Sequence, residues 1–253
     1  MVPVSVVILA KNEARSIGRT LQSLNRFTDD IVIVDNGSTD ETISIARSFG
    51  CRVIETSWLG YGPTKNQGIR AAKYDWIFTL DADEVPDQEV LQDISRHPLS
   101  DGRCVYESKF RTYFGDKWIR FGEWGRDEAI IVFNRCYVQW SDEPVHETLK
   151  LPEDARVIRL KGAIHHYTIN NEHELREKFS RYAALNAQKH RDARRSPLLK
   201  MWFAPAFNFV KNYVFRLGFL DGNEGFIIAK QSAYYTWLKY HLLRQVAREK
   251  RMA

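Results

Sequence analysis

Cysteine is scarce in this chain. Cys51, Cys104 and Cys136 are the three present in 253 residues, and their spacing matches neither a disulfide framework nor a cysteine-ligated metal site. A sparse, odd count of this kind indicates a reducing compartment. The N-terminus also lacks the basic segment, apolar stretch and small-residue cleavage site of a signal peptide, so we expect none.

The chain also lacks a long uninterrupted apolar run and a strong charge of one sign. Residues 198–220 are apolar and aromatic, but lysine, proline, asparagine and arginine interrupt them, which argues against a membrane-spanning helix. The 37 basic and 32 acidic residues leave a formal charge of +5, too small to indicate a nucleic-acid partner. No Gly-x-Gly-x-x-Gly follows a predicted strand, which argues against a dinucleotide enzyme.

What the sequence does contain is a regular alternation of apolar strands and helices over its first hundred residues. Short β-branched runs predict buried strands, and apolar residues at helical spacing lie between them. This alternation is typical of βαβ units and a parallel, doubly wound sheet. The predicted strands are residues 4–9, 31–34, 52–55 and 76–80, and the predicted helices are residues 17–24, 41–49 and 64–73.

Polar motifs follow three of these strands. They are Lys11-Asn12-Glu13, the segment 35–40 and the segment 81–84. Ligands of such sheets bind beyond the carboxyl ends of the strands, so we expect the three motifs to converge on one edge.

Asp81 and Asp83 are the clearest chemical signal at that edge. Alternate residues at a strand end project to the same side, and two carboxylates held close together repel unless a cation lies between them. Mg²⁺ or Mn²⁺ fits, because such ions bind through one or two carboxylates plus substrate phosphates. A solvated acidic turn is the alternative. Asp35 and Ser38 could contact a base and a ribose, or form only a turn and a helix cap.

Four segments taken in order carry a family resemblance: VVILAKNE, IVIVDNGSTDET, KNQGI and WIFTLDADE. Together they resemble the family 2 glycosyltransferases, which share the GT-A fold. The later segments VHETL, HHYT and FLDGNEG resemble the small lipopolysaccharide-core glycosyltransferases. The resemblance implies an α/β, Rossmann-like, mostly parallel sheet flanked by helices, followed here by a helical, basic-aromatic C-terminal extension.

The resemblance also implies roles for individual residues. Lys65 would approach the pyrophosphate, Asp81 would contact the ribose or the metal, and Asp83 would ligate the metal. His166 is the favoured third metal ligand, with His165 and His146 as alternatives, although a lone histidine is more often structural. The nucleoside pocket would be lined by Ala10, Asn12, Glu13 and Asp35, with Ser38 beside them.

The family inverts the anomeric carbon in one in-line displacement, which requires a base on the acceptor side. Family members often have an acidic pair after the acceptor loop, whereas this sequence has Val145-His146-Glu147. Glu147 is the favoured base and Asp127 is its rival. Asp142 and Glu143 are remoter candidates.

The C-terminal third is basic and aromatic. Around a helical wheel, the lysines, asparagines and arginine of residues 198–220 fall within one half, which predicts an amphipathic helix at a membrane interface. Packing against the catalytic domain or a second subunit is the alternative. The aromatics lie in an apolar stripe and are not interleaved with exposed cations, which argues against single-stranded nucleic acid.

We therefore expect an inverting, metal-dependent glycosyltransferase that uses a nucleotide-diphosphate sugar, with UDP as the first choice of nucleotide. The acceptor is expected to be lipid-linked, first of all the lipopolysaccharide inner core, with polyprenyl phosphate as the alternative. A non-catalytic membrane-binding module is the rival of another class. Residues 1–170 would form the catalytic domain (donor half 1–100, acceptor half 101–170) and residues 171–253 the membrane or oligomer region. The expected location is cytoplasmic, peripheral to the inner membrane.

Overall fold

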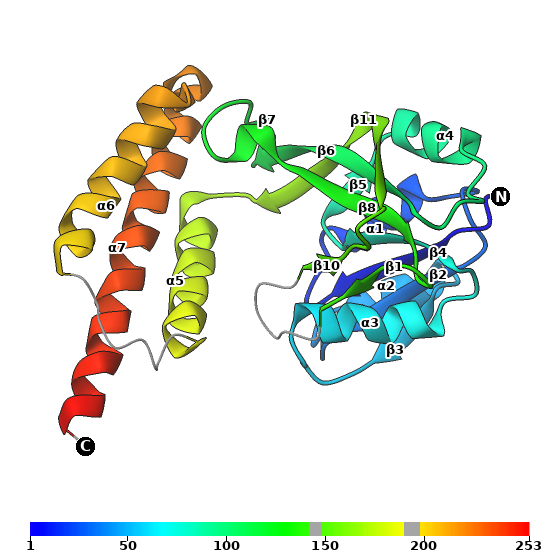
Figure 1. Ribbon diagram of the computed structural model, residues 1–253, viewed down its shortest axis with the longest axis horizontal. Coiled ribbons are helices and arrows are strands. Elements are labelled where there is room, and N and C mark those ends of the chain that lie inside the picture. Colours follow the sequence, from blue (N-terminus) through cyan, green and yellow to red (C-terminus); the bar gives the residue numbers. More distant parts are fainter. Residues whose placement is uncertain (142–147, 190–197, 253) are drawn as a thin grey trace. The chain divides into compact units, whose positions relative to one another are not determined.

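The computed structural model describes residues 1–141, 148–189 and 198–252 (Figure 1). The chain forms two compact units. The first comprises Met1–Phe110 and Glu128–His166, and the second comprises Arg111–Asp127 and Tyr167–Ala253. We describe each unit by itself.

Four parallel strands form the first half of the main sheet. Their order across the sheet is β3 (Arg52–Glu55), β2 (Ile31–Asp35), β1 (Ser5–Ala10) and β4 (Trp76–Asp81). Every residue of β1 is buried, as expected for a strand that is covered on both faces. These are the four strands that the apolar runs predict, with ends shifted by no more than one residue.

Beyond β4 the sheet becomes antiparallel, with β8 pairing antiparallel to both β4 and β6. The predicted α/β class with a helical C-terminal extension is confirmed, and its Rossmann-like parallel part is joined to an antiparallel part. The further strands, in spatial order, are β8 (Glu128–Asn134), β6 (Cys104–Phe114), β11 (Arg156–Ile169) and β5 (Glu84–Pro86), and β7 (Lys117–Trp118) pairs with β6.

Helices cover both faces of the parallel strands (Figure 1). On one face, α1 (Ile17–Ser23), α2 (Thr42–Ser48) and α4 (Gln88–Arg96) contribute to one apolar cluster. On the other face, α3 (Tyr61–Ala71) packs closely through Gly68, where a Cβ atom would lie 2.5 Å from side-chain carbons of Val7 and Val34. The glycine of the KNQGI segment therefore permits close contact between helix and sheet.

The second unit is mainly helical. In it α5 (Glu172–Lys189), α6 (Leu198–Val210) and α7 (Gly222–Met252) lie side by side (Figure 1). A π-helical turn, Lys211–Phe215, and a 3-10 turn, Gly218–Asp221, connect α6 to α7. Among the described residues, no helix is both long and apolar enough to cross a membrane.

Residues 111–127 belong to this helical unit rather than to the sheet unit. Phe114 and Trp124 of this segment pack in an apolar cluster with Leu175 and Ile228 of the helices. The buried carboxylate of Asp221 accepts hydrogen bonds from two backbone N–H groups of the segment, at 2.8 and 3.2 Å. The compact units therefore interleave along the chain, and the functional division predicted at residue 170 stays a prediction.

Candidate functional site

The loops after β1 and β2 are held together by their own polar side chains. Asn12 lies in the left-handed region (φ 56°), and its Oδ1 accepts a hydrogen bond from the Thr39 N–H at 2.8 Å. In return, the Asn12 N–H donates to Oγ of Ser38 at 2.8 Å. The Glu13 N–H donates to Oγ1 of Thr42 at 2.8 Å. The two motifs that the sequence predicts to converge therefore do so.

Asp35 ends β2 and is fully buried. Its Oδ1 accepts hydrogen bonds from the N–H groups of Gly37 and Ser38, both at 2.8 Å, and the Ser38 hydroxyl donates to Oδ2. Ser38 thus joins Asp35 to the Asn12 loop and does not cap α2, which begins at Thr42. Ala10 is the register partner of Asp35. The predicted nucleoside residues lie together, and their contact with a nucleoside stays a prediction.

The second polar group lies at the end of β4, next to β1. Oδ1 of Asp81 is 3.3 Å from Nζ of Lys65, which α3 supplies. This ion pair lacks hydrogen-bond geometry, so Oδ1 is a buried oxygen without a hydrogen-bond donor among the described residues. Lys65 also lies over the ring of Trp140, 4.9 Å from its centroid, in the short strand β9 (Gln139–Trp140).

Asp83 and His166 meet although they come from distant segments. Oδ2 of Asp83 lies 3.3 Å from Nε2 of His166, and both side chains are mostly buried. The antiparallel pairing of β5 with β11 places His166 opposite Glu84 and His165 opposite Val85. Because successive strand residues point to opposite faces, only one of the two histidines can face Asp83. Phe110 packs edge-on against His166.

Glu84 completes this acidic group and was given no role by the sequence. It is buried, and its Oε2 accepts a hydrogen bond from the Asp81 N–H at 2.9 Å. Burial raises the pKa of Glu84 to about 8, the negative charge of Asp81 acts in the same direction, and His166 opposes it. Without a bound cation, the Glu84 carboxyl is therefore largely protonated at neutral pH.

Some of the side chains at the end of β4 are of the kinds that bind divalent cations. In the described ranges, no group of three or more His, Cys, Asp or Glu side chains is arranged to hold a metal ion. Asp83 and His166 bring one carboxylate oxygen and one imidazole nitrogen, two possible metal ligands, close together. Mg²⁺ and related ions commonly take one or two protein ligands and complete their shell with substrate phosphates and water. The pair therefore fits a cation that binds together with a diphosphate.

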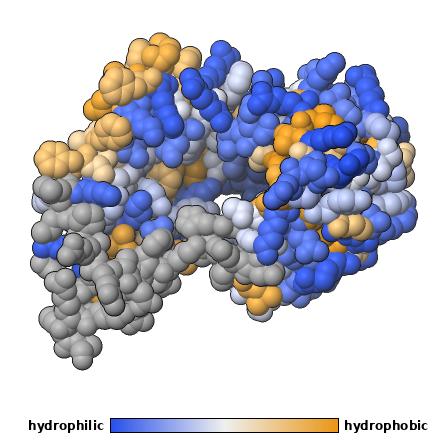
Figure 2. All heavy atoms as spheres, viewed as in Figure 1, coloured by the Kyte–Doolittle hydropathy of each residue, from blue (hydrophilic) through white to orange (hydrophobic). Residues whose placement is uncertain are grey.

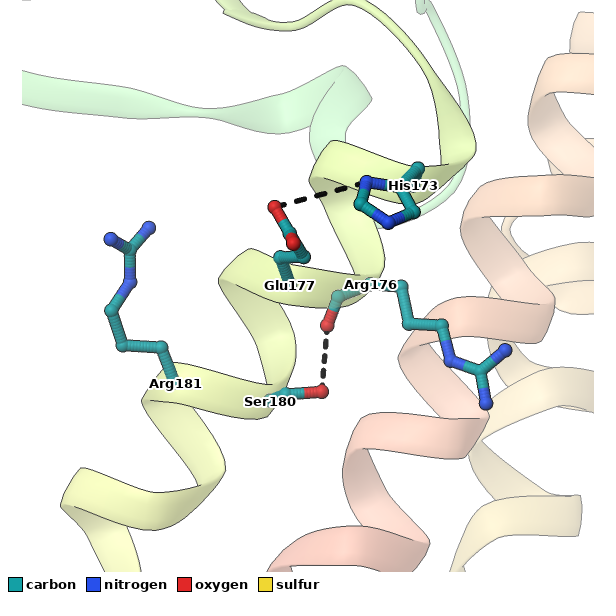
Figure 3. A pocket seen from close by; sticks show the side chains of 5 residues that line it. All are labelled: His173, Arg176, Glu177, Ser180 and Arg181. Atoms are coloured by element: carbon teal, nitrogen blue, oxygen red, sulfur yellow. Dashed lines mark hydrogen bonds and ion pairs between the residues drawn. The ribbon is translucent and has the colours of Figure 1, made fainter.

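A surface pocket of the helical unit contains none of the predicted site residues. Figure 3 shows its lining on α5, where Nδ1 of His173 lies 3.8 Å from an oxygen of Glu177. Ser180 donates to the backbone oxygen of Arg176 at 2.8 Å, and Arg181 completes the lining. The Arg176 guanidinium lies over the Tyr234 ring. Because this pocket contains none of the predicted site residues, the edge of the sheet remains the better candidate site.

Comparison with known proteins agrees with this geometry. Residues 5–120, which include every predicted donor-site residue up to Asp83, match the model of the family described as glycosyl transferase family 2. The chain carries a family 2 glycosyltransferase domain. The enzyme class predicted from the sequence is thereby confirmed.

Two relatives of this glycosyltransferase are similar over almost the whole chain. An uncharacterized glycosyltransferase of Rickettsia typhi is 28% identical, with 99% of this chain and 90% of the relative covered. The lipopolysaccharide core biosynthesis glycosyltransferase LpsC of Rhizobium meliloti is also 28% identical, covering 93% of this chain and 90% of the relative.

Among solved structures, glucosyl-3-phosphoglycerate synthase of Mycobacterium tuberculosis, in complex with Mn²⁺, uridine diphosphate and glucosyl-3-phosphoglycerate, is 21% identical. The match covers 44% of each chain at a TM-score of 0.35.

The catalytic base of the glycosyltransferase stays a prediction. Glu147, Asp142 and Glu143 lie outside the described residues, as does His146. Asp127 is exposed and forms the C-terminal cap of the 3-10 turn Trp124–Arg126, directly before β8.

Two further side chains of the glycosyltransferase were missed by sequence reasoning. Oδ1 of Asn36 is buried directly after Asp35 and has no hydrogen-bond partner among the described residues. Nε1 of Trp140 is likewise buried and has no hydrogen-bond partner among the described residues. A buried polar atom without a partner costs about 1–3 kcal/mol, so both atoms point to a missing partner such as a ligand. The D-N-G-S turn drew attention to Asp35 alone, and nothing in the sequence connects Trp140 to Lys65.

Proposed function

We propose that this chain is an inverting, metal-dependent glycosyltransferase that takes its sugar from a nucleotide diphosphate, with UDP as the nucleotide. The observation that carries the proposal is the group formed by Lys65, Asp81, Asp83 and His166 beyond the β4 end. It combines one cation with a carboxylate–imidazole pair, beside the nucleoside candidates that follow β1 and β2. Lysine is a common phosphate binder, and a cation held by one or two protein ligands can complete its shell with phosphate oxygens, so both kinds of group suit a nucleoside diphosphate.

The proposed donor contacts follow from these positions. Asp35 and Asn12, with Ala10, Glu13 and Ser38 beside them, would hold the nucleoside. Lys65, already paired with Asp81, would turn its ammonium group to the diphosphate, and Asp81 would then contact the ribose or the cation. Asp83 and His166 would hold Mg²⁺ or Mn²⁺. The cation would supply positive charge that stabilises the departing diphosphate.

Bond formation needs a group that removes a proton from the acceptor hydroxyl. Glu147 is the first candidate and Asp127 the second, each as general base in a single displacement that inverts the anomeric carbon. The carboxylate would take the hydroxyl proton as the acceptor oxygen bonds to the anomeric carbon and the bond to the diphosphate oxygen breaks.

The proposed acceptor is a saccharide carried by a lipid. The similarity to LpsC, whose name places it in lipopolysaccharide core biosynthesis, favours the inner core as the acceptor. Polyprenyl phosphate is the alternative, because it would need the same donor site. A lipid-linked acceptor would place the enzyme peripherally at the inner, cytoplasmic face of the membrane. The non-catalytic rival is disfavoured by the family 2 domain.

The test is transfer of labelled sugar from a panel of UDP- and GDP-sugars to lipid extracts, with lipopolysaccharide core and polyprenyl phosphate supplied separately. We expect one UDP-sugar to label the core lipid in the presence of Mn²⁺, and nuclear magnetic resonance of the product to report inversion. Asp83→Ala should abolish labelling, while Asp154→Ala, at an exposed carboxylate of the same unit, should not. Labelling that is equal in the Asp83→Ala variant would overturn the proposal.

A further inference from the structure

Helix α6 turns large aromatic side chains away from the protein. Trp202 and Phe203 are each 69% exposed and Phe207 is 64% exposed. Residues 203, 207, 210 and 214 follow at intervals of four and three, which places them on one side of a helix. Figure 2 shows hydrophobic residues gathered over this part of the chain. We define the aromatic face as Trp202, Phe203, Phe207, Val210, Val214 and Phe215.

The side of α6 that faces α7 carries polar side chains as well as apolar ones, since the ring of Phe209 lies 5.9 Å from that of Phe226 in α7. Nδ2 of Asn208 donates to Oγ1 of Thr236 in α7 at 3.1 Å. Asn212, which is 4% exposed, donates to Oδ1 of Asn208 at 2.8 Å. The helical wheel had grouped these asparagines with the lysines on a water-facing side, and the structure corrects that grouping.

The exposed side of the helix is thus apolar, whereas the exposed side of a helix on a water-soluble protein is usually polar. Met201 is buried, and it lies on the α7 side together with the asparagines. Packing of α6 against α7 therefore does not explain the aromatic face, since the residues that make it lie on the other side.

The charged side chains within residues 198–220 have one sign. Residues 198–220 contain no Asp or Glu, while Lys200 and Lys211 are exposed there. On the C-terminal side, the next acids along the chain are engaged elsewhere: Asp221 binds backbone N–H groups of residues 120 and 121, and Glu224 pairs with Lys117 at 2.7 Å. On the N-terminal side, the nearest acid is Asp192, which lies outside the described residues. The face therefore combines apolar rings with cations that have no acidic neighbour in this segment.

We propose that the aromatic face docks on the surface of a lipid bilayer that carries anionic headgroups. The rings would enter the boundary between headgroups and acyl chains, and Lys200 and Lys211 would contact the phosphates. This membrane-binding surface is inferred from the exposure and charge of these residues alone. It extends the proposed function, because an acceptor carried by a lipid would then be presented to the enzyme at the membrane. No described helix is long and apolar enough to span a membrane, so the aromatic face would lie on the surface of the bilayer.

A second copy of the chain fits this surface less well. A two-fold dimer brings the same patch of both subunits together. Lys200 and Lys211 beside the aromatic face of one copy would then lie near the same lysines of the other copy. Residues 198–220 contain no acidic side chain that could pair with them. An anionic bilayer supplies both the apolar phase and the opposite charge.

The test is cosedimentation of the full chain with vesicles of phosphatidylcholine, with or without phosphatidylglycerol. The variant Trp202→Ser/Phe203→Ser/Phe207→Ser should bind both kinds of vesicle at least about tenfold more weakly. The variant Lys200→Gln/Lys211→Gln should bind anionic vesicles about 25-fold more weakly, at about fivefold for each cation, and neutral vesicles unchanged. All of these positions are exposed, so the variants should fold, which circular dichroism verifies.

The control is Phe49→Ser/Tyr137→Ser, which removes two rings of the sheet unit that are 48% and 53% exposed. It should bind vesicles like the wild type. Calorimetric titration with UDP should give equal affinity for all variants, so a failed donor site and a failed membrane surface are distinguished. Absence of vesicle binding by the wild type, or equal binding by the serine variant, overturns the proposal. It is also overturned if the serine substitutions convert a dimer to a monomer and leave vesicle binding unchanged.

Discussion

Nε2 of His166 lies 3.3 Å from Oδ2 of Asp83, although one residue is in β11 and the other follows β4. The pairing of β5 with β11 brings them together. If both are metal ligands, His166→Ala should lower the Mn²⁺ affinity of the UDP complex at least about tenfold, since even outer-shell substitutions cost that much. Electron paramagnetic resonance of free Mn²⁺ measures this. His173→Ala, at an exposed histidine paired with Glu177, is the control and should have no effect. Equal affinities in all three proteins would exclude His166 as a ligand.

Lys65 is expected to bind the diphosphate and not the nucleoside. Lys65→Met removes the ammonium group near Asp81 and should weaken UDP binding about 10- to 100-fold, the value of a hydrogen bond to a charged group. Uridine affinity should not change, because uridine has no phosphate. Calorimetry with both ligands measures the difference, and Lys73→Met, at a lysine paired with Asp29, is the matched control. An equal loss for uridine would show that Lys65 acts by supporting the fold of the site.

Glu84 should make stability depend on pH. Burial and the charge of Asp81 raise its folded-state pKa to about 8 from a usual 4.5, so between these values the folded protein binds more protons than the unfolded chain. The free energy of unfolding should therefore fall as pH rises from about 4.5 to about 8. Glu84→Gln keeps an oxygen for the Asp81 N–H and removes the titration. Urea unfolding in metal-free buffer should give a flatter curve for the variant, and parallel curves would contradict the shifted pKa.

Substitution by alanine should have opposite effects on stability at two helical glycines. Gly68→Ala would place a methyl group 2.5 Å from carbons of Val7 and Val34, and overpacking of this kind costs about 1–3 kcal/mol. Gly18→Ala in α1 meets only Ile45, at 3.8 Å, and should stabilise the fold by about 0.5–1 kcal/mol. Thermal unfolding of both variants compares them. A Gly68→Ala variant as stable as the wild type would show that α3 can move away from the sheet.

The parallel half of the fold could be predicted because each of its strands is a short continuous apolar run. The runs at 4–9 and 31–34 become β1 and β2, and the polar motifs that follow them meet as expected. The pattern is local, and the rule that parallel strands share one edge supplies the rest.

The antiparallel half could not be predicted in the same way. The pairing of β5 with β11 joins segments that are far apart in sequence, and no periodicity encodes it. The burial of Glu84 and the contact of His166 with Asp83 depend on that pairing, so only a family resemblance pointed to the histidine. The grouping of residues 111–127 with the C-terminal helices also arises from long-range contacts.

In the proposed donor site, Asp83 helps to hold a divalent cation with a nucleoside diphosphate at the edge of the parallel strands. Calorimetric titration with UDP, with and without Mn²⁺, tests it most directly when wild type, Asp83→Ala and Asp154→Ala are compared. We expect Mn²⁺ to strengthen UDP binding to the wild type and to Asp154→Ala, and we expect Asp83→Ala to lose this gain. UDP binding that is unaffected by Mn²⁺ in the wild type, or a gain that persists in Asp83→Ala, would contradict it.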